Sequence, residues 1–198
     1  MLKNLRYQLI FSEAILFIGL AVCILIRPAG LAANNGISYY GTFHNTLLPY
    51  IIALAGSSFC LVLITIFYLK GSWQDNLIKT IFTLLFFLII GIIIFPYNVN
   101  RTYADIHATL GTIIFSTQFI ISIIFTFINP RDIYGLIILI IEFVGGLVSI
   151  YYLKPAHGFL IQGQIIAQFG FALFIIHNRY KIFKSVKIDQ FPVDNIEV

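Results

Sequence analysis

Long apolar runs separated by short polar segments are the dominant pattern along this chain of 198 residues. The runs show no alternating polar face, and each is close to the roughly 20 apolar residues that a helix needs to cross a membrane. Helix-breaking or polar residues fall between them, as at Arg27-Pro28 and Asn129-Pro130-Arg131. Six runs can be marked: Leu9–Ile26, Leu47–Leu69, Leu77–Phe95, Ile106–Ile128, Tyr134–Tyr152 and Phe159–Ile176.

Many of these runs are rich in isoleucine, which favours β-strands in water. In lipid, however, a segment must satisfy its own backbone hydrogen bonds, so the runs are expected to be helices. The composition agrees, because 60% of the residues are hydrophobic and only 10% are charged, outside the range of soluble domains. We therefore predict an all-α integral membrane bundle of six transmembrane helices, built as three helical hairpins. Residues 1–178 form this domain, and residues 179–198 form a tail that is first basic and then acidic.

The positive charges predict an orientation for the bundle. Nine of the twelve Lys and Arg residues lie on the side of the two termini, and three lie on the other side. The positive-inside rule then places both termini in the cytoplasm. The net charge of +4 does not indicate a nucleic-acid partner, because the basic residues are scattered over span ends and the tail. The expected partners are membrane lipids, and a homo-oligomer remains open.

Three histidines mark the outer ends of the even-numbered spans, namely His44, His107 and His157. Such imidazoles can cap helix ends and meet lipid headgroups, or they can converge on a metal such as zinc. Arg101 and Asp105 lie in the same outer layer. Asp105 and His107 are two residues apart, so both can point inward only if the helix begins between them.

A second polar layer lies deeper in the predicted bundle. It comprises Gln118 in span four, Glu142 in span five, and Gln164 and Gln168 in span six. Helical spacing puts His157, Gln164 and Gln168 on one face, so span six should carry a polar stripe. A carboxyl at the depth of Glu142 should be neutral or firmly hydrogen-bonded, and the glutamines are its expected partners.

Small residues predict close helix packing at two places. Gly145, Gly146 and Ser149 follow Glu142 at helical spacing and form a face against which a neighbouring helix can pack. Ser57-Ser58 could suggest a serine nucleophile, but a helix contact explains these small residues without a positioned base.

The predicted first and last apolar runs each have a titratable residue near their cytoplasmic end. These residues are Glu13 and His177. They could pair there. Side chains at that depth are expected to snorkel toward the interface instead.

Short motifs give the chain a resemblance to a known group of proteins. These motifs are Gly36-Ile37-Ser38-Tyr39-Tyr40-Gly41, Phe95-Pro96 followed by His107, and the glutamine-bearing start of span six. The chain resembles a prokaryotic six-span family known only as a domain of unknown function. More distantly it is similar to the damage-regulated autophagy modulators and the remodelling factor that acts after GPI attachment.

The resemblance implies a compact bundle in a prokaryotic plasma membrane, with a first outer loop that folds over an outward-facing polar pocket. Proteins of this group are linked to lipid handling. In the first motif the family carries an acidic residue after the serine, where this chain has Tyr39.

The leading functional hypothesis is a bundle that binds a lipid or another amphipathic small molecule without a cofactor. Its expected ligand-binding residues fall in the two polar layers and are Arg101, Asp105, His107, His157, Gln118, Glu142, Gln164 and Gln168.

Two alternatives stay open, so the sequence does not decide whether the protein is an enzyme. One is an intramembrane hydrolase that acts on a lipid, with zinc held by His44, His107 and His157 and with Asp105 or Glu142 as base. The other is a small transporter subunit. It is less favoured because no span is interrupted except near Pro49, and six spans would need to dimerise for alternating access.

Overall fold

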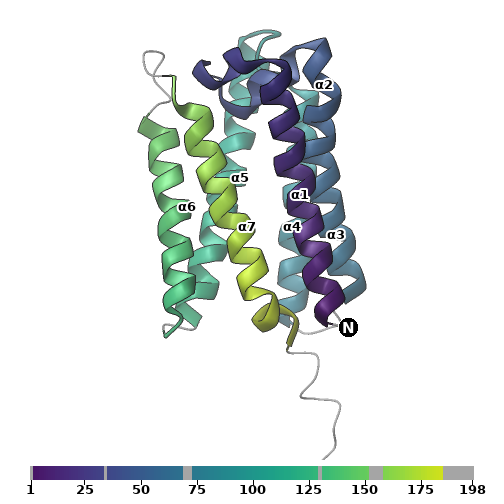
Figure 1. Cartoon of the computed structure of the whole chain (residues 1–198), viewed down its shortest axis with the longest axis vertical. Coiled ribbons are helices and arrows are strands. Elements are labelled where there is room, and N and C mark those ends of the chain that lie inside the picture. The colour runs from purple at the N-terminus through teal and green to yellow at the C-terminus, as the bar shows by residue number, and fades with distance from the viewer. Residues whose placement is uncertain (1, 34, 69–72, 129–130, 152–157, 185–198) are drawn as a thin grey trace, which may run out of the picture.

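The protein is an all-α bundle of long helices that run side by side (Figure 1). The computed structural model describes residues 2–33, 35–68, 73–128, 131–151 and 158–184, and none of these residues forms a strand. The predicted fold class is therefore confirmed. The α-helices are α1 (Leu2–Ile26), α2 (His44–Ile51), α3 (Ser57–Tyr68), α4 (Trp73–Ile94), α5 (Arg101–Ile128), α6 (Ile133–Tyr151) and α7 (Leu160–Lys184).

Six helical segments are long and apolar enough to cross a membrane, which makes the chain an integral, multi-pass membrane protein. They are Leu5–Ile26, His44–Tyr68, Asn76–Ile94, Arg101–Ile128, Ile133–Tyr151 and Leu160–Asn178. Several helices begin before the apolar runs do, because a first turn can be polar. Helix α5 begins at Arg101 because the Asn100 side chain caps it, with Oδ1 accepting a hydrogen bond from the backbone N–H of Tyr103 at 2.9 Å.

The second span is irregular in its middle. Pro49 lies inside α2, and a π-helical segment, η3 (Ile52–Gly56), separates α2 from α3. Proline removes a backbone donor from a helix, and π-helical turns often accompany functional sites. The interruption predicted near Pro49 is thus a local widening of the helix that does not break the span.

Two short 3₁₀ helices, η1 (Pro28–Ala32) and η2 (Gly36–Thr42), cover one end of the bundle (Figure 1). We call this the loop end, and the opposite end, where α1 begins and α7 finishes, the terminal end. Arg27 helps to fix the loop end, because its guanidinium lies 3.5 Å from the ring centroid of Phe43 and its Nε donates to the Tyr39 hydroxyl at 3.1 Å.

The buried apolar side chains form two clusters. The cluster in the terminal half closes the space between the helices, and it includes Leu5, Leu9, Ile78, Phe82, Phe125 and Phe174. The cluster in the loop half packs α1 and α2 against η2 and α7, and it includes Leu20, Cys23, Ile37, Tyr40, Tyr50 and Ile161.

Helices α6 and α7 form a closely packed hairpin held by glycines. A Cβ atom at Gly170 would lie 2.7 Å from the backbone nitrogen of Glu142, and one at Gly163 would lie 2.6 Å from that of Ser149. A Cβ at Gly145 would collide with the backbone of Ala167. The predicted small-residue face is therefore confirmed at Gly145 and Ser149. It is wrong at Gly146, where a Cβ would meet nothing within 4 Å.

Candidate functional site

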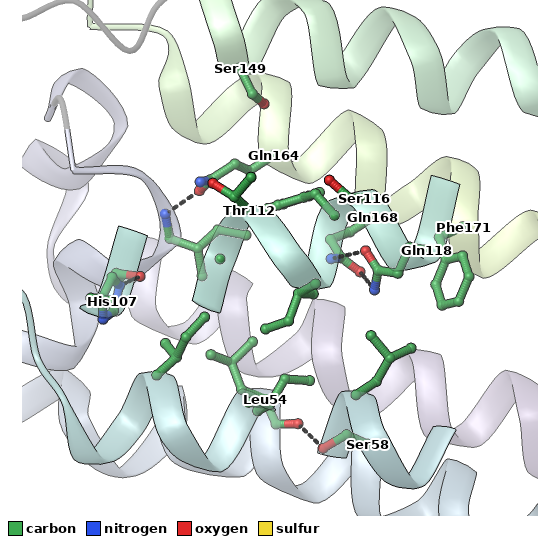
Figure 2. A pocket seen from close by; sticks show the side chains of 18 of the residues that line it. Leu54, Ser58, His107, Thr112, Ser116, Gln118, Ser149, Gln164, Gln168 and Phe171 are labelled. Atoms are coloured by element: carbon green, nitrogen blue, oxygen red, sulfur yellow. Dashed lines mark hydrogen bonds between the residues drawn. The ribbon is translucent and has the colours of Figure 1, made fainter. Parts of the chain in front are cut away.

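A cavity of about 510 Å³ lies inside the bundle, bordered by α1, α3, α4, α5 and α7 and by one edge of α6. This volume falls within the range of small-molecule sites, roughly 300–1,000 Å³. Most of its lining is apolar and includes Leu16, Leu61, Phe82, Leu85, Ile89, Ile92, Ile114 and Phe171. Figure 2 shows that the polar lining is distributed along the cavity, with His107 at one end and Gln118 and Gln168 near the other.

His107 holds the loop end of the cavity together. Its Nδ1 lies 2.8 Å from the carbonyl oxygen of Phe95, and its Nε2 lies 2.7 Å from Oγ of Ser38. A carbonyl can only accept, so Nδ1 carries a proton. The ring thereby ties α5 to the turn after α4 and to η2. Tyr97 lines the cavity beside it, and burial raises the pKa of its phenol, which stays neutral at physiological pH.

Gln164 joins α7 to the covering loop. Its Oε1 accepts a hydrogen bond from the backbone N–H of Ile37 at 2.7 Å. The loop can approach this closely because residue 36 is glycine with φ of +61°, and any Cβ there would overlap the Gln164 side chain. Gln164 and Gln168 both line the cavity, as the predicted polar stripe requires, whereas His157 lies outside the described residues.

Gln118 and Gln168 form a reciprocal pair across the interior. Nε2 of Gln118 donates to Oε1 of Gln168 at 3.3 Å, and Nε2 of Gln168 donates back to Oε1 of Gln118 at 3.0 Å (Figure 2). Each amide thus satisfies the other at membrane depth. The expectation that the glutamines bond to Glu142 is wrong, because their side chains are engaged with each other and with the loop.

Glu142 is buried, at 4% exposure, but it is absent from the cavity lining. It lies close to Ser122 of α5. By hydrogen-bond geometry, Oε2 of Glu142 and Oγ of Ser122 have no partner among the described residues. Helix α7 packs closely against Glu142 at Gly170, and the carboxyl is not part of the cavity lining.

Glu13 lines the cavity, although the ends of the predicted apolar runs placed it near the cytoplasmic boundary. Its side chain is only 6% exposed and lines the interior, so the expected snorkelling is wrong. The physical reason is the helix start. Helix α1 begins at Leu2, before the apolar run that starts at Leu9, so Glu13 lies eleven residues, or about 16 Å, into the helix. Ser57 and Ser58 line the same cavity from α3.

His177 does not reach Glu13. Its Nε2 lies 2.9 Å from Oδ2 of Asp132, just before α6, at the terminal end. Asp132 also accepts a hydrogen bond from the backbone N–H of Gly135 through Oδ1 at 3.1 Å. This contact fastens the end of α7 to the start of α6, and it lies outside the cavity lining.

The cavity reaches the surface of the bundle between α5 and α6. The rings of Phe119 and Phe143 stack at 5.7 Å and close the contact of these helices at mid-height. Toward the loop end, the same faces carry Thr112 and Ser116 on α5 and Ile150 on α6, all exposed and all part of the cavity lining. A ligand dissolved in the bilayer could therefore enter sideways above the stacked rings.

The remaining predicted residues lie apart from the interior. Arg101 and Asp105 are exposed in the first turns of α5, and His44 is exposed at the start of α2; none of them lines the cavity. Asp105 and His107 do not both point inward, because the helix begins before both of them. Within the described residues no three His, Cys, Asp or Glu side chains come together as metal ligands, so the zinc set stays a prediction.

Comparison of the chain with protein-family models, with curated proteins and with solved structures finds no match. The family resemblance of the short motifs therefore stays a prediction.

Proposed function

We propose that this membrane protein binds a lipid-like, amphipathic small molecule in its interior cavity. The observation that carries the proposal is the cavity itself, a space of about 510 Å³ at membrane depth with apolar walls and a small number of placed polar groups. Binding sites for small molecules have this character, because apolar walls supply affinity and a few polar groups fix the orientation of the ligand.

The position of the opening supports a ligand from the bilayer. Thr112, Ser116 and Ile150 border it on the lateral surface of α5 and α6, which faces lipid in a spanning bundle. The apolar cluster of the terminal half closes the opposite direction, with Phe82 shared between that cluster and the cavity lining. A molecule with an apolar chain and a polar group could enter from the bilayer through this opening, and it matches the mostly apolar lining of the cavity.

The orientation belongs to the same proposal. The positive-inside rule supports a terminal end in the cytoplasm and a loop end outside. The resemblance of the short motifs supports a prokaryotic plasma membrane. Arg101 and Asp105, exposed near the start of α5, would then meet lipid headgroups at the outer surface rather than the bound ligand.

Filling the cavity tests the proposal. Gly111 lines the cavity, and a Cβ there would have its nearest neighbour at 4.0 Å, so Gly111→Leu places a larger side chain in the space where the ligand would lie. We expect this variant to lose most of the amphiphile that copurifies with, or is added to, the unaltered protein. Native mass spectrometry of protein released from nanodiscs measures the bound fraction.

Ala21→Leu is the matched control, because Ala21 is exposed on α1 and is not part of the cavity lining. It adds a side chain of the same kind to the lipid-facing surface and should leave binding unchanged. Equal binding by the Gly111→Leu variant, or no saturable binding by the unaltered protein, would overturn the proposed function.

A further inference from the structure

Glu13 is a buried carboxyl group inside the cavity, without a bonding partner in the part of the chain that the structure describes. It is 6% exposed and lines the interior beside α3. Among the described residues, no side chain or backbone group forms a hydrogen bond or ion pair with it. A polar group withdrawn from water without a partner is costly, and a carboxylate more so. The cavity therefore offers an acidic group that a ligand can pair with.

The serine hydroxyl groups of α1 and α3 near Glu13 donate their protons to backbone carbonyls. Ser12 donates to the carbonyl of Ser57 at 2.8 Å and so holds α1 against α3. Ser57 and Ser58 both donate to the carbonyl of Leu54 in the π-helical segment, at 3.2 Å and 2.8 Å. What Ser57 and Ser58 still offer to the cavity is oxygen lone pairs. This wall can accept hydrogen bonds but has no hydroxyl proton left to donate.

The charged residues of the cavity lining also favour a cationic ligand over an anionic one. Glu13 is the single acidic residue among the described residues that line the cavity. The lining has no described Lys or Arg, and its one basic side chain, His107, has both ring nitrogens engaged by Phe95 and Ser38 at the loop end. An anionic group would therefore lie next to a carboxyl without a Lys or Arg as counter-charge. A cationic group would gain an ion partner in an environment that strengthens such pairs.

We propose that the ligand of this cavity carries a protonated amine, which binds to Glu13 and to the hydroxyl oxygens of Ser57 and Ser58. An ammonium group has three N–H donors and no acceptor, which matches a wall made of acceptors. The neighbouring apolar side chains of Leu16 and Leu61 then face its hydrocarbon part. This inference rests on the proposed function and names the chemical class of the ligand.

Three single-chain probes of equal length test the proposal: dodecylamine, dodecanol and dodecanoate. Each is titrated into the full-length protein in nanodiscs of zwitterionic lipid, with empty nanodiscs as the blank. We expect the amine to bind about thirtyfold or more tightly than the alcohol, because loss of one partner of a buried charge pair typically costs at least this much. Dodecanoate should bind most weakly of the three.

Two variants identify the residue responsible. Glu13→Gln keeps the size of the side chain and removes its charge, so the amine should fall to the affinity of the alcohol. Glu142→Gln is the matched control, because Glu142 is the other strongly buried acid of the described spans but lies outside the cavity lining, and it should change nothing. Glu13→Asp keeps the charge and should retain the preference for the amine.

The outcomes separate this inference from the proposed function. If amine and alcohol bind equally and Gly111→Leu abolishes both, the cavity binds amphiphiles but the amine proposal is overturned. If none of the probes binds saturably, both proposals fail. The ratio of amine to alcohol affinity in the unaltered protein decides the amine proposal even where a Glu13 variant does not fold.

Discussion

Buried amide side chains show how single residues are accommodated in this bundle. Gln118 is 6% exposed at membrane depth, yet both its donor and its acceptor meet the matching groups of Gln168. Because water is absent from the hydrocarbon region, an amide that lost its partner could not replace it with solvent. The pair therefore fixes the contact between α5 and α7 as long as both members are present.

Removal of one member should cost more than removal of both. We expect Gln168→Leu to lower the free energy of unfolding by about 1–2 kcal/mol, because it leaves the Gln118 amide unpaired. The double variant Gln118→Leu/Gln168→Leu should be less destabilised than the sum of the two single variants. Thermal unfolding in detergent, followed by circular dichroism, measures all four proteins of this cycle. Strict additivity would show that the two side chains do not act as a pair.

At the scale of elements, the α6–α7 hairpin is set by which glycine faces the partner helix. Gly145 and Gly146 are neighbours in the sequence, but one turns its missing side chain toward the backbone of Ala167 and the other toward open space. Gly163 and Gly170 supply the matching contacts from α7. Close backbone approach through small residues is a common way for membrane helices to pack, because lipid provides no hydrophobic drive between them.

The two adjacent glycines should respond in opposite directions to the same substitution. Gly145→Ala forces α6 and α7 apart and should lower the free energy of unfolding by about 1–3 kcal/mol. Gly146→Ala meets no neighbour and should raise it by up to about 1 kcal/mol, since alanine favours a helix over glycine. Unfolding in detergent compares the two variants directly. Equal effects would mean that the close approach at Gly145 does not hold.

At the scale of the whole molecule, the interior is divided along the membrane normal. The terminal half is filled by an apolar cluster, and the cavity lies between that cluster and η2. Segments η1 and η2 cover the loop end of the bundle (Figure 1). Tyr40 of η2 is completely buried in this cover, and burial raises the pKa of its phenol. Such a cavity has a closed end and an end under a loop, so its function depends on the orientation of the bundle.

The orientation can be measured with reporter fusions. Because positive charge is concentrated on the side of the termini, a green fluorescent protein joined to the C-terminus should fluoresce, and alkaline phosphatase at the same position should be inactive. Phosphatase inserted after Asn98, in the turn between α4 and α5, should be active. The reverse pattern would place the cover over the cavity in the cytoplasm and would contradict the proposed orientation.

The sequence alone determined the fold class and the six spans. In lipid, a long apolar segment must form a helix, so hydrophobic length is enough to predict a span at Ile106–Ile128, although the helix itself begins with a polar turn at Arg101. Helical spacing also placed Gln164 and Gln168 on the face that lines the cavity. The small-residue face around Gly145 was predictable for the same reason, because it depends on local periodicity.

Only the tertiary structure decided which polar residues share one site. The rotation of each helix about its own axis and the choice of neighbours depend on packing between segments that are distant in the chain. Glu142 was expected in the site and is buried outside the cavity lining, whereas Glu13 was expected at the interface and lies inside the cavity. An apolar run marks the hydrophobic part of a helix and does not show where the helix begins. The structure shows that α1 begins at Leu2, so Glu13 lies well inside the helix.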